Sequence, residues 1–260
     1  MNGEERGRSN GQPVVLVTGA AGTIGKAVAA ALAAREAALA LTDADRARLD
    51  AIATHLRERG HSVLAEAADL RSASEVSTLV GHVLAELGGV QACVLGAGIE
   101  GPVAPVDEIT DDELAAIFDV NVSSMVRVLR ELLPVFRRQG GGRIVALASG
   151  AGTGGAPYLA AYTASKHAVV GLVRSVALEE ARSGVSINAV CPGNVASPML
   201  ARIEDRLAKL DPGLATGPAC VPMGRYAEPA EVAELVAFLA LDAPAYITGA
   251  ALPIDGGLRV

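Results

Sequence analysis

Short runs of apolar residues alternate along the chain with longer segments in which apolar residues recur at helical spacing. The apolar runs lie at 13–18, 38–42, 63–67, 90–95, 144–148, 186–191 and 250–254. Runs of this length and composition are typical of parallel strands that are buried on both faces. Segments such as 46–59 and 74–87 predict helices between them. Because strand and helix alternate about seven times without a break in composition, we expect an α/β fold with one doubly wound parallel sheet and helices on both faces.

The length and composition fit one domain. A chain of 260 residues lies near the upper size of a single core, and 51% of its residues are hydrophobic. Aromatic residues make up 3% and Trp is absent, so Ala, Val, Leu and Ile must form the interior. We expect residues 13–260 to form the domain, and residues 1–12, which are polar and rich in Gly, to be a disordered tail.

Charge and hydropathy disfavour several classes of partner. A formal net charge of −7 argues against nucleic acid, which binds to basic surfaces. No apolar run reaches the ~18 residues of a membrane span, and the polar N-terminus does not fit a signal peptide. Cys93, Cys191 and Cys220 lack the spacing of paired or metal-binding cysteines. We therefore expect a cytoplasmic protein with reduced thiols, no metal and no membrane partner.

A Gly-rich turn follows the first predicted strand. The sequence Thr18-Gly19-Ala20-Ala21-Gly22-Thr23-Ile24-Gly25 leads directly into an Ala-rich segment with helical spacing. A strand, a Gly-rich turn and a helix N-terminus together can surround a pyrophosphate with backbone N–H groups. The glycines at 19, 22 and 25 do not follow the G-x-G-x-x-G spacing, so the turn alone does not identify a ligand.

Asp43 ends the second apolar run, 24 residues after Gly19. An acidic residue at about this distance is expected to accept hydrogen bonds from the ribose of a bound dinucleotide. No Arg or Lys occurs at 20–24, and Ala44 follows, so a 2′-phosphate would meet repulsion and no partner; this favours NAD over NADP. The alternative is that Asp43 caps the helix predicted at 46–59, a position for which Asp45 competes.

The candidate chemistry lies between residues 143 and 180. Ser149 follows the strand predicted at 144–148, and a helix then carries Tyr162 and Lys166 on one face, at positions i and i+4. A neighbouring ammonium favours the phenolate and lowers the pKa of a phenol, which is otherwise about 10. With the Ser149 hydroxyl beside it, this pair predicts a proton-transfer site for alcohol–ketone chemistry. The alternative is an ordinary surface pair on a helix.

Other polar or small residues follow the remaining strands. Gly96-Ala97-Gly98 allows a ligand to approach closely, although it could equally form a tight turn. Asn121 lies within a long helical region predicted at 110–139, where its amide must be hydrogen-bonded either to the backbone or within a site. Residues 196–225, which contain several Pro and Gly, are expected to form a mobile, partly helical lid.

Taken together and in this order, these motifs resemble the short-chain dehydrogenase/reductase (SDR) family over residues 13–257. The most specific part is Tyr162-Thr163-Ala164-Ser165-Lys166, which matches the Y-x-x-x-K motif and has Ser149 lying 13 residues upstream. Supporting motifs are the VNV context of Asn121, Pro192-Gly193, Ser197-Pro198-Met199, Ile247-Thr248-Gly249 and Asp255-Gly256-Gly257.

The resemblance implies a Rossmann-type fold and specific roles. It implies that Tyr162 is the general acid/base, that Lys166 lowers its pKa and holds the nicotinamide ribose, that Ser149 orients the substrate oxygen and that Asn121 anchors a water in a proton relay. Asp69 would face the adenine, and Val195 would bind the carboxamide through its backbone. The full set of expected cofactor-binding residues is Gly19, Gly22, Thr23, Ile24, Gly25, Asp43, Asp69, Leu70, Gly96, Ala97, Gly98, Tyr162, Lys166, Pro192, Gly193, Val195 and Ser197.

Two motifs depart from the family pattern. Thr23 stands where the family has the middle Gly of T-G-x-x-x-G-x-G, and Leu95-Gly96-Ala97-Gly98 replaces N-N-A-G. The Thr23 side chain would either crowd the pyrophosphate or donate to a phosphate oxygen. The backbone groups that the two missing Asn side chains would satisfy need other partners.

The leading hypothesis is an NAD(H)-dependent oxidoreductase that interconverts a secondary alcohol and a ketone. The alternatives are a non-redox biosynthetic enzyme (cyclase, dehydratase or epimerase) on the same scaffold, and an NAD-binding sensor without catalysis. The resemblance implies a homotetramer, or a homodimer, formed by the helices at 110–139 and 160–180 and by the C-terminal segment. The residues around the turn at 150–159 and Met199 suggest an apolar pocket and an uncharged or weakly polar substrate. The composition suggests a bacterial source.

Overall fold

The chain folds around one seven-stranded parallel sheet. The computed structural model describes residues 11–259, and the predicted disorder of residues 1–12 falls mainly on residues outside that range. The strand order is β3-β2-β1-β4-β5-β6-β7. The strands are β1 (Val14–Thr18), β2 (Ala38–Thr42), β3 (Val63–Ala65), β4 (Ala92–Leu95), β5 (Gly142–Leu147), β6 (Val185–Pro192) and β7 (Ala251–Ile254). This confirms the predicted doubly wound Rossmann-type sheet.

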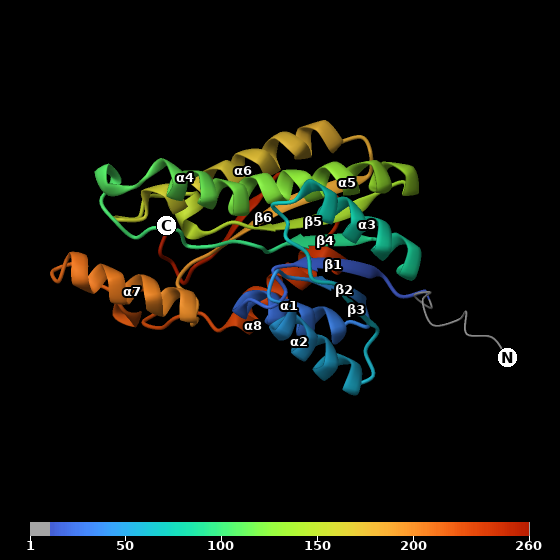
Figure 1. The fold of residues 1–260 in the computed structure, drawn as a ribbon, viewed down its shortest axis with the longest axis horizontal. Coiled ribbons are helices and arrows are strands. Elements are labelled where there is room, and N and C mark those ends of the chain that lie inside the picture. The colour runs from blue at the N-terminus through green and yellow to red at the C-terminus, as the bar shows by residue number, and fades with distance from the viewer. Residues whose placement is uncertain (1–10, 260) are drawn as a thin grey trace.

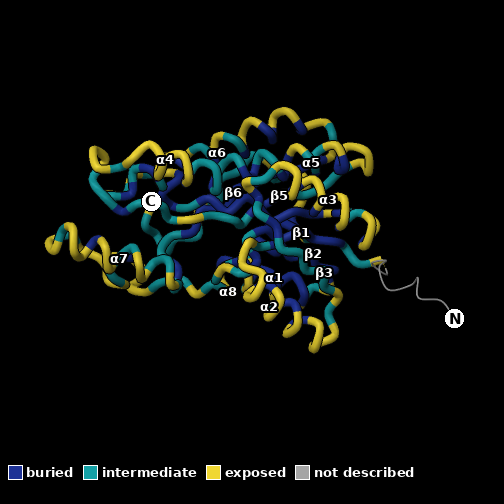
Figure 2. The backbone as a smooth tube through the Cα atoms, in the orientation of Figure 1, coloured by how far each residue is buried: buried dark blue, intermediate teal, exposed yellow. Residues whose placement is uncertain are grey.

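Helices cover both faces of the sheet (Figure 1). On one face lie α1 (Thr23–Ala33), α2 (Arg46–Glu58) and α8 (Pro229–Ala237), and on the other lie α3 (Ala73–Leu87), α5 (Ser124–Gln139) and α6 (Ala160–Glu180). Side chains of successive strand residues alternate between the faces: Leu16 packs with the second group of helices, and Val15 and Val17 pack with the first. Figure 2 shows the resulting buried sheet between helices whose outer sides are exposed.

The helical region predicted at 110–139 is not one continuous α-helix. It consists of α4 (Asp111–Phe118), a π-helical turn at Asp119–Ser123 and α5. A capping box between Thr110 and Glu113 starts α4. The π-helical turn contains Asn121, whose side chain is completely buried. One extra residue in a helical turn does not disturb a hydrophobic pattern enough to be seen in the sequence, and such turns are frequent at functional sites.

The predicted lid contains one regular helix. α7 (Pro198–Leu210) begins at Ser197, whose hydroxyl accepts a hydrogen bond from the N–H of Leu200 at 3.2 Å, and a 3-10 turn follows at Pro218–Cys220. In Figure 1, α7 lies beyond the end of the sheet rather than on either face. Among residues 11–259, no helix is both long and apolar enough to cross a membrane.

The buried face of α5 generates a test of how the core contributes to stability. Leu132 is fully buried between α5 and the sheet, whereas Leu178 on α6 is 81% exposed. Replacing Leu132 by Ala leaves a cavity, so Leu132→Ala is expected to lower the free energy of unfolding by about 2–5 kcal/mol. Leu178→Ala deletes the same atoms from a side chain that already lies in solvent. It is expected to change the free energy of unfolding by less than about 0.5 kcal/mol. Urea unfolding followed by circular dichroism compares the two, and equal losses would contradict the assigned packing.

Candidate active site

The site lies where the direction of strand addition reverses in the sheet. β1 pairs with β2 on one side and with β4 on the other, and α1 and α3 cover opposite faces. In such sheets the crevice beyond the carboxyl ends of these strands is the usual ligand site. Two adjoining cavities open here, of about 410 and 360 Å³, and we call them the cofactor cavity and the substrate cavity. Tyr162 lines both of them.

Nearly all of the predicted cofactor residues meet in the first cavity. It is lined by Gly19, Gly22, Thr23, Ile24, Gly25, Asp43, Asp69, Leu70, Gly96, Ala97, Gly98, Tyr162, Lys166, Pro192 and Ser197. The two exceptions, Gly193 and Val195, line the substrate cavity instead. Arg71 and Ser124 also line the cofactor cavity, and the sequence analysis did not identify them.

The Gly-rich turn is shaped by close backbone contacts. Gly19 has φ +67°, and a Cβ atom there would lie 2.7 Å from backbone atoms of Gly96 and Ala97. A Cβ on Gly25 would lie 2.1 Å from the carbonyl oxygen of Gly19. No side chain caps the start of α1 at Gly22, so the first N–H groups of the helix face the cofactor cavity. An open helix N-terminus beside glycines fits a pyrophosphate.

Asp43 is held in place by backbone groups. Its Oδ2 accepts a hydrogen bond from the N–H of Ala21 at 2.9 Å, and its Oδ1 accepts one from the N–H of Asp45 at 3.0 Å. The N-cap of α2 is Asp45, whose side chain accepts from the N–H of Arg48. The helix-capping alternative for Asp43 is therefore wrong, and its carboxylate lies in the wall of the cofactor cavity.

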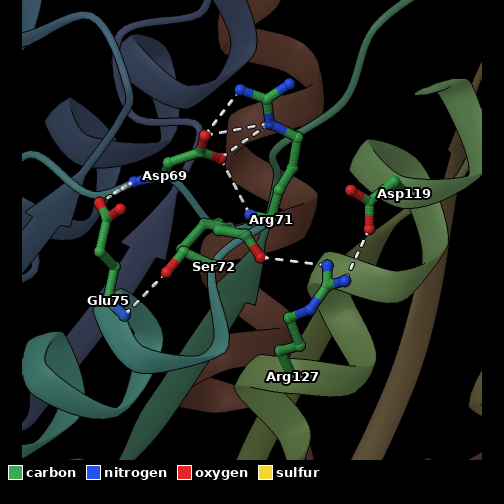
Figure 3. Close-up of polar contacts among 7 residues, drawn as sticks. Asp69, Arg71, Ser72, Glu75, Asp119 and Arg127 are labelled. Carbon is green, nitrogen blue, oxygen red and sulfur yellow. Dashed lines mark hydrogen bonds and ion pairs between the residues drawn. The ribbon is translucent and has the colours of Figure 1, made fainter.

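At the far end of the cofactor cavity, Asp69 is held by an arginine (Figure 3). Nη2 of Arg71 donates to Oδ2 of Asp69 at 2.7 Å, and Nε of Arg71 is within 3.0 Å of both carboxylate oxygens. This hydrogen-bonded guanidinium lowers the pKa of Asp69. The backbone N–H of Asp69 donates to Glu75, and Arg127 links the carbonyl of Leu70 to Asp119. The segment that would face an adenine is therefore fixed by α3 and α5.

Thr18 takes over part of what the two missing Asn side chains would do. Its hydroxyl oxygen accepts hydrogen bonds from the N–H groups of Gly96 at 3.0 Å and Ala97 at 3.3 Å, and its hydroxyl donates to the carbonyl of Val94. A Cβ atom on Gly96 would lie 2.7 Å from the carbonyl oxygen of Thr18. The backbone of β1 approaches β4 so closely here that only Gly fits at position 96.

The catalytic candidates converge from two elements. Ser149 follows β5, and Tyr162 and Lys166 lie on α6. The ammonium nitrogen of Lys166 lies 5.7 Å from the centre of the Tyr162 ring and donates to the carbonyl of Leu147 at 2.9 Å. Lys166 is buried on the cofactor side, whereas Ser149 lines the substrate cavity, so Tyr162 lies between them. The surface-pair alternative is therefore wrong.

Burial, rather than the neighbouring cation, governs the pKa of Tyr162. Removal from water raises the pKa of the Tyr162 phenol, the hydrogen bond to Ser149 opposes this rise, and the charge of Glu100 adds to it. Burial likewise lowers the pKa of Lys166 to about 8. The rise in the pKa of Tyr162 is opposite in direction to the lowering expected from a neighbouring ammonium, because removal from water disfavours the phenolate.

Asn121 is bound entirely within the protein. Its Oδ1 accepts a hydrogen bond from the N–H of Ile99 at 2.8 Å, and its Nδ2 donates to the carbonyl of Ile99 and to the hydroxyl of Ser165, both at 3.0 Å. Both N–H groups of the amide are thus used in joining the loop after β4 to α6. This supports the alternative interpretation, in which the Asn121 side chain positions the walls of the site.

α7 closes the substrate cavity from the outside. Nε of Arg202 on α7 donates to Oε1 of Glu100 at 2.7 Å, which links the helix to the loop after β4. On the same helix, Leu207 packs with Val103 and Leu159 in a small apolar cluster that is separate from the two clusters on the faces of the sheet. A cofactor-sized cavity, a covered apolar cavity and a Tyr–Ser pair between them can support proton transfer to a bound carbonyl oxygen.

Comparison with known proteins agrees with this geometry. A family model described as enoyl-(acyl carrier protein) reductase matches residues 19–259. A diacetyl reductase ((S)-acetoin forming) of Staphylococcus epidermidis is 34% identical over 250 residues, which are 94% of this chain and 97% of that protein. A structure of an actinorhodin polyketide ketoreductase variant with NADPH has a TM-score of 0.90 and 35% identity, covering 95% of this chain and 97% of that one. A structure of NAD+-bound xylitol dehydrogenase has a TM-score of 0.89 and 34% identity, covering 94% and 98%.

The fold and the site define a nicotinamide-dependent oxidoreductase that acts on CH–OH groups and the corresponding carbonyls. More particularly, the chain belongs to the short-chain dehydrogenase/reductase family. Solved relatives hold either NADPH or NAD+, so family membership alone does not select between the two cofactors.

The lowered pKa of the buried Lys166 can be tested through the pH dependence of protein stability. Its pKa is about 8 in the folded chain and near 10.5 without burial, so between these values the unfolded chain binds more protons than the folded one. The free energy of unfolding of the wild type is therefore expected to rise from pH 8 to about 10.5 relative to Lys166→Met, by up to about 3 kcal/mol. Urea unfolding at a series of pH values measures the difference.

The matched control for that experiment is Lys209→Met, which removes an exposed lysine of α7. Its stability is expected to follow the wild type across the same pH range. Wild-type and Lys166→Met curves that stay parallel would contradict a lowered pKa for Lys166.

Proposed function

We propose that this protein is an NAD(H)-dependent oxidoreductase that interconverts a secondary alcohol and a ketone, with Tyr162 as the general acid/base. The observation that carries the proposal is the position of Tyr162, which lines both cavities, with Lys166 on the cofactor side and Ser149 on the substrate side. The names of related proteins, which include a diacetyl reductase, a levodione reductase and a xylitol dehydrogenase, support ketone and alcohol substrates.

The residues of the chain supply position and a proton. Ser149 holds the substrate oxygen beside the Tyr162 hydroxyl through its own hydroxyl, which is fixed by the N–H of Ala151 at 3.1 Å. For ketone reduction Tyr162 donates its proton to that oxygen, and for alcohol oxidation its oxygen accepts the proton. The raised pKa keeps Tyr162 protonated at neutral pH, which suits the donor role. When bound, the nicotinamide supplies or accepts the hydride.

Lys166 would hold the nicotinamide ribose and stabilise negative charge as it develops on the Tyr162 oxygen. Its ammonium is anchored by the Leu147 carbonyl at the end of β5, so it does not need to reorganise during the reaction. Asn121 acts as a positioning residue, since it holds Ile99 against α6.

The preference for NAD rests on Asp43. Its carboxylate is fixed by two backbone N–H groups in the wall of the cofactor cavity, where it would accept hydrogen bonds from ribose hydroxyls and repel a 2′-phosphate. Arg71, the arginine that lines the same cavity, is bound to Asp69, which leaves it poorly placed to neutralise an added phosphate.

The non-redox alternative loses its motivation in this geometry. It rested on the missing Asn side chains at Leu95-Gly96, and the Thr18 hydrogen bonds with the close approach of β1 and β4 account for that change structurally. The catalytically silent sensor also has less support, because Ser149, Tyr162 and Lys166 converge on one site. Cytoplasmic localisation and a homotetramer or homodimer remain proposals, and light scattering would test the assembly.

Tyr162→Phe tests the catalytic role. Removing the hydroxyl leaves the ring in place, so NADH consumption with diacetyl or 4-oxocyclohexanecarboxylate is expected to fall by about 10²–10⁴-fold. NADH affinity, measured by fluorescence titration, is expected to change less than about threefold, since the ring still lines the cavity. Tyr246→Phe, at a fully exposed tyrosine, is the matched control and is expected to keep wild-type activity. Undiminished turnover in Tyr162→Phe would refute the assigned role.

Asp43→Asn tests the cofactor preference. The wild type is expected to bind NADH more tightly than NADPH, and loss of the carboxylate is expected to reduce the ratio of affinities about tenfold, since both ribose binding and phosphate repulsion weaken. Asp50→Asn, on the exposed side of α2, removes one negative charge away from the cavity and is expected to leave the ratio unchanged. A wild type that prefers NADPH would overturn the assignment of Asp43.

A further inference from the structure

We propose that Arg259 makes the substrate cavity selective for alcohols and ketones that carry a carboxylate group away from the reacting carbon. This inference rests on the proposed function and names the class of substrate. It departs from the expectation of an uncharged substrate, which considered the turn at 150–159 and Met199 but not the last residues of the chain.

The guanidinium of Arg259 packs against the Gly-rich turn that follows Ser149. Its Nη2 donates to the carbonyl of Gly155 at 2.8 Å. A Cβ atom on Gly154 would lie 2.6 Å from Nη1 and 2.9 Å from Cζ of Arg259, so the absence of a side chain at position 154 is what admits the guanidinium. On Gly150 a Cβ atom would lie 3.8 Å from Nε, within ordinary contact.

The position of Arg259 places a positive charge in the same cavity as Ser149 and Tyr162. Arg259, Ser149 and Tyr162 all line the substrate cavity of about 360 Å³. The C-terminus and α7 lie at the same end of the molecule, beyond the sheet (Figure 1). A small ligand could therefore present its oxygen to Tyr162 and a second polar group to Arg259, with an apolar body between Leu159 and α7.

The other charged residues in the cavity wall are acids with separate partners. Oε1 of Glu204 accepts from the N–H of Gly217 at 3.1 Å and from the Tyr226 hydroxyl at 2.5 Å. Oδ1 of Asp255 accepts from the N–H of Gly257 at 3.0 Å, and its Oδ2 is buried without a hydrogen-bond partner. Within residues 11–259 neither acid forms an ion pair with Arg259.

Within residues 11–259, the Gly155 carbonyl is the one hydrogen-bond acceptor of the Arg259 side chain, so most of its N–H groups are available there for a ligand. A guanidinium matches the geometry of a carboxylate and can bind it through two parallel hydrogen bonds, whereas a neutral group gains much less. The acids Glu204 and Asp255 would disfavour an anion elsewhere in the cavity. The carboxylate of a bound substrate is thus directed to the Arg259 end, and the reacting carbon to Tyr162.

The test uses two ligands that differ only in charge, cyclohexanecarboxylate and cyclohexanecarboxamide. Their binding to the NADH complex is measured by calorimetry for the wild type, Arg259→Gln, Arg259→Lys and Arg182→Gln. Arg182 is exposed in the turn between α6 and β6, outside the two cavities, and its variant controls for the loss of one positive charge.

The wild type is expected to bind the carboxylate about tenfold more tightly than the carboxamide, as a charged hydrogen bond permits. Arg259→Gln is expected to lose that preference while binding the carboxamide as the wild type does, and Arg259→Lys to keep part of it. The preference should also weaken at high ionic strength, because Arg259 is exposed. A wild type that binds both ligands alike, or neither, overturns the proposal. Equal weakening of both ligands in Arg259→Gln would show that Arg259 only supports the turn.

Turnover separates this inference from the proposed function. NADH consumption is measured with 4-oxocyclohexanecarboxylate and its carboxamide. A carboxylate preference in binding without any turnover would count against the proposed function and leave the charge selectivity standing. Turnover of both ketones with equal kcat/KM would support the proposed function and overturn the role of Arg259.

Discussion

A close backbone contact joins the ends of β1 and β4, and the rest of the site depends on it. A Cβ atom on Gly19 would lie 2.7 Å from backbone atoms of Gly96 and Ala97, and a Cβ atom on Gly96 would lie 2.7 Å from the carbonyl oxygen of Thr18. The Thr18 hydroxyl stabilises this contact by accepting hydrogen bonds from the N–H groups of Gly96 and Ala97. The contact sets the start of α1 beside the loop after β4, and so fixes both walls of the cofactor cavity. An Asn at position 96, as in the family pattern, does not fit this backbone. The replacement of that Asn by Gly is therefore required by the close packing of β1 against β4.

Burial shifts the pKa values of the two candidate catalytic groups in opposite directions, and in each case it favours the neutral form. The pKa of Tyr162 is raised and that of Lys166 is lowered, because a low-dielectric environment disfavours both charged forms. A buried ammonium that keeps one fixed acceptor, the Leu147 carbonyl, is still poised to respond to charge that develops nearby. The site is therefore better described as a protonated phenol beside a fixed ammonium than as a phenolate stabilised in advance.

The fold was predictable from the sequence because strand burial leaves a strong signal. Seven apolar runs matched seven strands, and no strand end differed by more than two residues from the prediction. Most residues that line the cofactor cavity were predictable because they follow the carboxyl ends of the strands and match the motifs of the family. Features that depend on the third dimension were not: the π-helical turn at Asn121, the Arg71–Asp69 pair and the partners of Asn121 come from packing between elements far apart in the chain. The pKa of Tyr162 was misjudged for the same reason, since spacing reports a neighbour but not its burial.

The division between rigid and adaptable parts of the molecule follows from these contacts. Ser149 follows β5, and Tyr162 and Lys166 lie on α6, and both elements pack in the core, so the relative positions of the three residues are set by the core. Residues that line the outer part of the substrate cavity belong instead to α7, to the Gly-rich turn after β5 and to the last residues of the chain. These segments pack through a small apolar cluster and single polar contacts, such as Glu100 with Arg202 and Arg259 with Gly155. Substitutions in these segments are expected to change which molecule fits in the substrate cavity, whereas the positions of Ser149, Tyr162 and Lys166 depend on the core.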